Sequence, residues 1–206
     1  MWHWRKENFE GLQQISEYLA GKEPLSKFKE YCEYREKGLR KEAFAKLNEF
    51  IDGALDWKFN DKKEFSDWVL WVNNGSPEII DLIPQPLKAR FIEPVLKEWK
   101  EIEPNNSAPF RWSGGLEDLR KAIQLNQDDQ IARIKLAEII LTATNYSIHE
   151  LPNGYLGDAN DDLDLVLEAL KVIENIKNND KNISIWAELS ENYKIITEFI
   201  LNKNAS

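Results

Sequence analysis

Apolar side chains recur at intervals of three and four residues along nearly the whole chain. This spacing places them on one face of an α-helix, which has about 3.6 residues per turn. No segment shows the two-residue alternation of apolar and polar side chains that a half-buried strand requires. The pattern therefore predicts an all-α protein of about nine helices, most of them joined by short connections that favour stacked antiparallel hairpins.

One segment, residues 103–115, interrupts the helical pattern. It is rich in turn-forming residues, namely Pro104, Asn105, Asn106, Pro109, Gly114 and Gly115. A chain of 206 residues can form one large domain or two small ones. We therefore expect either a single helical domain over 1–206, or two subdomains, 1–102 and 116–206, joined by residues 103–115. Pro94 lies inside another predicted helix and should kink or break it, because proline has no backbone N–H to donate.

Composition and cysteine content indicate a folded protein of the cytoplasm. Hydrophobic residues make up 42% of the chain and charged residues 31%, as in globular proteins. Cys32 is the single cysteine, so no internal disulfide can form, and its apolar neighbours suggest a small buried side chain. The first residues lack the apolar run of a signal peptide, and no later apolar stretch is long enough to span a bilayer. We expect a cytoplasmic protein that does not bind membranes.

The negative charge is concentrated in one part of the chain. Residues 116–170 contain 11 acidic and 4 basic side chains, which accounts for −7 of the net charge of −9. Such a field repels phosphate backbones, which argues against nucleic-acid binding, and it attracts basic proteins. The alternative is a solvated acidic face that only aids solubility.

A predicted loop, residues 144–160, contains the groups best suited to chemistry. His149 could act as a base oriented by Glu150 or Asp158, with Tyr155 donating a hydrogen bond to a developing oxyanion. In the alternative interpretation, Tyr155 and neighbouring leucines anchor the loop on the helices, and His149 satisfies a backbone carbonyl. Together with Asp161 and Asp162 these residues are candidate binding residues, but we assign no catalytic residue.

No metal or cofactor is expected. No second histidine stands one helical turn from His149, so a zinc-protease motif is missing. Asp158, Asn160 and Asp162 have the spacing of the first ligands of a calcium loop, but Leu163 and Ala169 stand where that loop needs glycine and glutamate. Asn160 or Asp161 is instead expected to cap the helix that follows.

A second candidate binding site is Arg111-Trp112, followed by Gly114-Gly115 and a helix whose first amides could receive an anion. The alternative role for Trp112 is to cover the boundary between the two subdomains.

Most of the other tryptophans fall on helical stripes and are expected in the core, although Trp68 and Trp71 together spread apolar surface around their helix. These other tryptophans are Trp2, Trp4, Trp57, Trp68, Trp71, Trp99 and Trp186.

Two stretches carry small and large apolar residues at offsets that resemble tetratricopeptide repeats. The first comprises Tyr34, Gly38, Ala43 and Leu47, and the second Leu119, Ala122, Leu125, Leu136, Ala137 and Ile140. The resemblance implies a right-handed superhelix of stacked hairpins that binds other proteins and is not an enzyme.

Three functions remain open at this point. The first is a non-catalytic helical-repeat module that binds another protein. The second is an immunity or antitoxin-type protein that neutralises a basic toxin, since a small acidic chain suits electrostatic steering and occlusion. The third is an enzyme or small-molecule binder that uses the 144–160 loop, with Arg111 and Trp112 contributing if the two loops meet.

Overall fold

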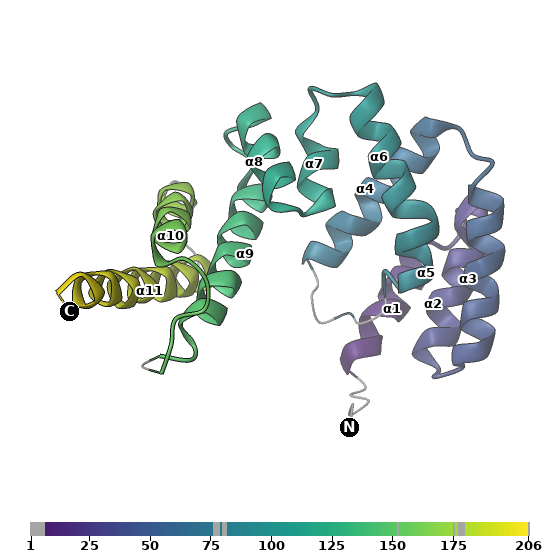
Figure 1. Cartoon of the computed structure of the whole chain (residues 1–206). Helices are drawn as coiled ribbons and strands as arrows, with labels where there is room; N and C mark the ends of the chain where they lie inside the picture. The colour runs from purple at the N-terminus through teal and green to yellow at the C-terminus, as the bar shows by residue number, and fades with distance from the viewer. Residues whose placement is uncertain are drawn as a thin grey trace. The chain divides into compact units, whose positions relative to one another are not determined.

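The computed structural model (Figure 1) is built from helices, and the part of the chain that it describes contains no β-strand. It describes residues 7–75, 79, 82–151, 153–174, 176 and 180–205. The chain divides into two compact units, Met1–Pro104 and Asn105–Ser206. The predicted all-α fold class is therefore confirmed.

The first unit is a succession of helices that pack on near neighbours in the chain. Its elements are α1 (Glu7–Tyr18), the 3-10 turn η1 (Glu23–Leu25), α2 (Ser26–Glu36), α3 (Arg40–Ala54), α4 (Phe59–Gly75), α5 (Gln85–Leu87), the π-helical segment η2 (Lys88–Ile92) and α6 (Glu93–Ile102). Helix α1 packs on α2, α2 on α3, and α4 on α6. The short helix expected from Ser76-Pro77 lies outside the described residues.

Helices α2 and α3 form a hairpin because Gly38 ends the first of them. Gly38 has φ of 75°, a left-handed conformation that glycine adopts without steric cost. The Leu39 amide then donates to the Tyr34 carbonyl over 2.9 Å, which closes the turn. Beyond it, Ala43 and Leu47 on α3 are completely buried. The turn and the small-large pair thus hold the two helices face to face.

Aromatic side chains from four segments meet in the core of the first unit. Phe65 of α4 has ring centroids 5.2 Å from Phe28, 4.9 Å from Phe50 and 5.8 Å from Phe91. Trp57, in the turn between α3 and α4, packs edge-on against Phe65 at 6.2 Å. Such offset and edge-to-face pairs stabilise a core beyond the area they bury. Phe65 therefore links α2, α3, α4 and the η2 segment.

The helix that contains Pro94 is distorted and not broken. Pro94 lies in the first turn of α6, directly after the π-helical segment η2. The Glu93 amide donates to the Lys88 carbonyl five residues earlier, which widens the turn just before the proline. Because proline lacks an N–H and its ring clashes with the preceding turn, this wider turn lets the chain remain helical.

The second unit contains five described helices. They are α7 (Ser107–Ser113), α8 (Leu116–Leu125), α9 (Gln130–Ile148), α10 (Ala159–Glu174) and α11 (Asp180–Ala205). Helix α7 packs on α8, α8 on α9, and α9, α10 and α11 pack on one another. Their shared core is apolar and includes Leu119, Ala122, Leu136, Ala137, Ile140, Ala169 and Leu189.

Two expectations about loops in this unit are wrong. Residues 107–113, predicted as part of a linker, form α7, which Asn106 caps by accepting a hydrogen bond from the Ala108 amide over 3.0 Å. The proline at position 109 fits because the first turn of a helix needs no amide donors. The predicted loop 144–160 is also shorter, since α9 continues to Ile148 and α10 begins at Ala159.

The tryptophans divide between core and surface, which corrects the expectation that most are buried. Trp99 and Trp112 are buried, and Trp57 and Trp68 are half-buried. Trp71 on α4 is 59% exposed and Trp186 on α11 is 52% exposed. Trp2 and Trp4 lie outside the described residues.

Candidate functional site

The side chain of His149 is engaged by its immediate neighbours. Its Nδ1 lies 2.5 Å from the carbonyl oxygen of Tyr146, and its Nε2 lies 2.9 Å from Glu150 Oε1. A carbonyl and a carboxylate both only accept hydrogen bonds, so each ring nitrogen of His149 faces an acceptor. Within the described residues, no hydrogen bond or ion pair joins His149 to Tyr155 or Asp158. The histidine thus follows the end of a helix and contacts Glu150, one of its two predicted partners, but it is not joined to Tyr155 or Asp158.

Tyr155 anchors the loop between α9 and α10. Its hydroxyl donates a hydrogen bond to Asp162 Oδ2 over 2.7 Å, and its ring stacks on Phe199 of α11 with centroids 5.0 Å apart. Burial and the neighbouring carboxylate raise the pKa of Tyr155 above its ordinary value. A nearby backbone bond from Leu156 to the Ser147 carbonyl, 3.0 Å long, closes the loop. The anchoring interpretation of this tyrosine is the one the geometry supports.

Asp158 is the residue that caps α10, which corrects the expectation that Asn160 or Asp161 does so. Its Oδ1 accepts from the amides of Asn160, at 2.8 Å, and Asp161, at 3.3 Å. These backbone hydrogen bonds lower the pKa of the Asp158 carboxyl. Asp161 is exposed in the first turn of α10, whereas Asp162 accepts the bond from Tyr155.

Arg111 and Trp112 lie on α7 and contact the first half of α9. Arg111 donates to Asp129 Oδ2 over 3.0 Å, and Asp129 also caps α9 by accepting from the Ala132 amide at 3.1 Å. The Arg111 guanidinium lies 4.5 Å from the centroid of the Trp112 ring, and Lys135 Nζ lies 4.4 Å from it. Burial, and then the charge of Arg111, lower the pKa of Lys135 to about 8. Lys135 was not singled out from the sequence, because one lysine on a helix face carries no local signal.

The two predicted sites do not meet. Arg111 bonds to the residue that caps the first turn of α9, and His149 follows the last turn. A helix of 19 residues is about 28 Å long. A small-molecule pocket of ordinary size does not span that distance. The composite site that would use both loops is therefore not formed.

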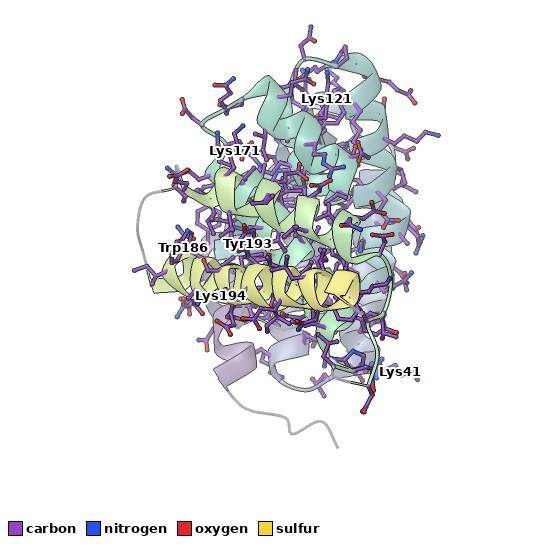
Figure 2. All side chains as sticks on the ribbon, turned by 60° about the vertical axis from the view of Figure 1, so that its left-hand side comes forward. Lys41, Lys121, Lys171, Trp186, Tyr193 and Lys194 are labelled. Carbon is purple, nitrogen blue, oxygen red and sulfur yellow. The ribbon has the colours of Figure 1, made fainter. Side chains whose placement is uncertain are left out.

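The last helix of the second unit exposes a stripe of apolar side chains, of which Trp186 and Tyr193 are labelled in Figure 2. We call it the α11 stripe: Ile183 (55% exposed), Trp186 (52%), Tyr193 (38%) and Leu201 (62%). Their spacing places them on one face of the helix. The buried face of the helix lies beside the stripe and carries Ile185, Leu189, Asn192 and Ile196. The sequence periodicity predicts apolar residues on both faces, and it does not indicate which face other helices cover.

A pocket of about 490 Å³ opens in the first unit, at a place that the sequence did not indicate. Of the aromatic residues that line this pocket, the sequence analysis named only Trp68 as a possible contact with a partner. The lining residues come from α1 and the turn after it, from the α3–α4 turn and from α4: Tyr18, Leu19, Lys22, Pro24, Leu25, Trp57, Asp61, Glu64, Phe65 and Trp68. We call it the aromatic pocket. Residues from such distant positions form no motif, so only the fold brings them together.

Among the described residues, no group of histidine, cysteine, aspartate and glutamate side chains has the arrangement of a metal site. None of the helices, as far as they are described, is long and apolar enough to cross a membrane. Compared with protein-family models, with curated proteins and with solved structures, the chain shows no match.

Proposed function

We propose that this chain is a non-catalytic protein-interaction module made of tetratricopeptide-like helical hairpins, and that its partner is a basic protein. The α11 stripe is the observation that carries the proposal. Tryptophan and tyrosine contribute most to protein interfaces, because they bury a large area with few rotatable bonds. Trp186 and Tyr193 present such area on the surface of a regular helix, where a partner can reach both at once.

The charge around the stripe supports a basic partner. Glu191 and Glu198 are exposed on the same helix, and Glu191 has an ion pair with Lys194, at 3.3 Å. Residues 116–170 add a net charge of −7, from 11 acidic and 4 basic side chains. Complementary charge steers a partner toward the surface and raises the association rate.

The packing positions of the hairpins support the repeat architecture. The residues at the small and large positions of the resemblance are largely buried: Ala43, Leu47, Leu119, Ala122, Leu136, Ala137 and Ile140. They lie between neighbouring helices, as the repeat would require. An enzymatic role for the 144–160 segment has no comparable support, since Tyr155, Asp158 and Asp162 hold the loop and cap the helix.

The test is affinity capture followed by direct binding of the purified partner. The variant Trp186→Ala/Tyr193→Ala removes the centre of the stripe, and Trp71→Ala removes an equally exposed tryptophan from the first unit as a matched control. We expect a basic protein that binds the wild type and Trp71→Ala and loses roughly tenfold or more in affinity for the double variant. Binding that is the same for all three proteins, or a partner that is not basic, would overturn the proposal.

A further inference from the structure

We propose that the aromatic pocket of the first unit binds an organic ammonium ion, that is, a positively charged nitrogen with alkyl substituents. The proposal is independent of the function argued above, because every residue of the pocket belongs to the other unit. Three observations carry it: the arrangement of the rings, the two carboxylates beside them, and an ammonium group of the chain itself that already lies on one ring.

The rings of the pocket are held in place by the core behind them. Tyr18 and Trp68 stack with centroids 5.8 Å apart and an angle of 15° between their planes. Trp68 packs on Phe65 at 6.0 Å, and Trp57 meets Phe65 edge-on at 6.2 Å. Phe65 is itself buried among other aromatic rings. The pocket therefore presents preformed aromatic surface, and the faces of such rings carry the negative part of a quadrupole that attracts cations.

Two carboxylates give the pocket a negative charge. Asp61 and Glu64 stand three residues apart on α4, so both side chains lie on the same face of the helix. Both line the pocket and are exposed, and neither forms an ion pair with another described residue. Within the lining, Lys22 is the one positively charged residue that accompanies them. Aromatic walls and two carboxylates, against one lysine among the described lining residues, favour a cation over a neutral or anionic ligand.

Lys22 shows how an ammonium group sits in this pocket. Gly21 has φ of 79°, which turns the chain back after α1, and the Lys22 amide donates to the Leu19 carbonyl over 3.1 Å. The Lys22 ammonium then lies 3.5 Å from the centroid of the Tyr18 ring. The side chain is exposed and can swing away into solvent. We infer that a ligand cation takes its place, and that Lys22 competes with the ligand.

The volume of the pocket indicates a ligand larger than a bare ammonium ion. The pocket encloses about 490 Å³, and a water molecule occupies only about 30 Å³ of the liquid. Leu19, Pro24 and Leu25 supply apolar lining beside the rings. A primary ammonium needs three hydrogen-bond acceptors, whereas an N-methylated one needs contact with apolar and aromatic surface. The lining therefore fits an N-methylated ammonium that carries a further apolar portion.

The experiment is a calorimetric titration of the full chain with choline and with its uncharged isostere, 3,3-dimethylbutanol. A second arm uses a short peptide with one trimethyl-lysine and the same peptide with unmodified lysine. We expect choline or the trimethyl-lysine peptide to bind and the uncharged isostere not to bind. The tighter of the two cations identifies the source of the ligand as a free small molecule or a modified protein side chain.

Variants connect the binding to the pocket. Trp68→Ala and Tyr18→Leu should each weaken binding of the cation by roughly tenfold, and Asp61→Asn/Glu64→Gln should weaken it as well. Lys22→Gln should strengthen it, because the competing ammonium is gone. Trp71→Ala and Glu42→Gln are the matched controls, since both are exposed in the same unit and lie outside the pocket.

Three results would overturn the proposal: no binding of either cation, equal binding of the uncharged isostere, or binding that Trp68→Ala and Tyr18→Leu leave unchanged. Because Trp68 is half-buried, its variant must be shown to be folded by circular dichroism. Tyr18 is 58% exposed, so Tyr18→Leu removes the ring at little risk to the fold and keeps the test decisive.

Discussion

Arg111 at the end of α7 donates a hydrogen bond of 3.0 Å to the carboxylate of Asp129, the residue that caps α9. The Asp129 side chain is 1% exposed, and its other oxygen accepts from the Ala132 amide. One carboxylate therefore connects the start of α9 to α7. This is why the residues 107–113, which look like a linker in the sequence, are ordered as a helix.

Removing the Asp129 charge should destabilise the second unit. Asp129→Ala leaves Arg111 without its carboxylate and α9 without its cap, and we expect a loss of about 3 kcal/mol in the free energy of unfolding. Asp128→Ala is the control, because Asp128 is exposed and lies next to it in the chain. Urea denaturation of both variants measures the difference. Equal stability of the two would show that the Asp129 contacts contribute nothing.

Lys135 should make the stability depend on pH in alkaline solution. Its pKa is about 8 in the folded protein and 10.5 as the ordinary value, so the unfolded state binds more protons between these two pH values. The contribution of Lys135 to the free energy of unfolding therefore rises as the pH increases from about 8 to 10.5. Methionine carries no charge, so the variant Lys135→Met should be more stable than the wild type at pH 7. The difference in free energy of unfolding between the two proteins should be smaller at pH 10. A difference that does not change with pH would contradict this.

Cys32 should be unreactive until the first unit unfolds. The side chain is completely buried, and burial raises the pKa of its thiol well above the ordinary range, so almost no thiolate is present at neutral pH. Because it is the single cysteine, labelling by a thiol reagent reports on one position. We expect the labelling rate to increase with urea in parallel with loss of the helical circular dichroism signal. Rapid labelling in native buffer would show that this helix opens locally.

The pair Arg120 and Glu168 should couple α8 to α10. Arg120 donates from Nε over 2.8 Å and from a terminal nitrogen over 2.6 Å to the two carboxylate oxygens, and it also bonds to Glu117. Both side chains are about a third exposed, so solvent weakens the interaction. A double-mutant cycle with Arg120→Met and Glu168→Gln should give a coupling of about 1 kcal/mol that decreases in 1 M salt. Absence of coupling at low salt would mean that the Arg120–Glu168 pair contributes nothing to the free energy of unfolding.

Several helices could be placed from the sequence because local signals agree there. Leu116–Leu125 forms a helix as predicted, since Gly115 precedes it, acidic residues occupy its first turn and its apolar residues keep one face. The α2–α3 hairpin follows from Gly38 in the same way. Prediction failed where long-range contacts dominate. Helix α7 is joined to Asp129 through Arg111, and α9 extends past residue 143, where the buried Thr144 accepts a hydrogen bond from Asn192 of α11.

The candidate site was harder to predict than the fold. The loop residues His149, Tyr155 and Asp158 are adjacent in sequence and attracted attention, yet their side chains serve the loop and the helix ends. The aromatic pocket uses Tyr18, Trp57 and Trp68, which are far apart in the sequence. No pattern over so few and so distant residues distinguishes a pocket wall from an ordinary core stripe.

The sequence alone determined that the chain is helical, that its negative charge lies mainly in residues 116–170, and where glycine and proline end or distort its helices. These properties depend on residues a few positions apart, so the order of residues along the chain is enough to predict them. Only the tertiary structure decided which of two apolar faces of α11 is covered, that Arg111 and His149 lie at opposite ends of α9, and that Lys22 folds back onto Tyr18 beside Trp68. Burial and proximity depend on how helices pack, because each apolar face can be covered by any helix of suitable shape.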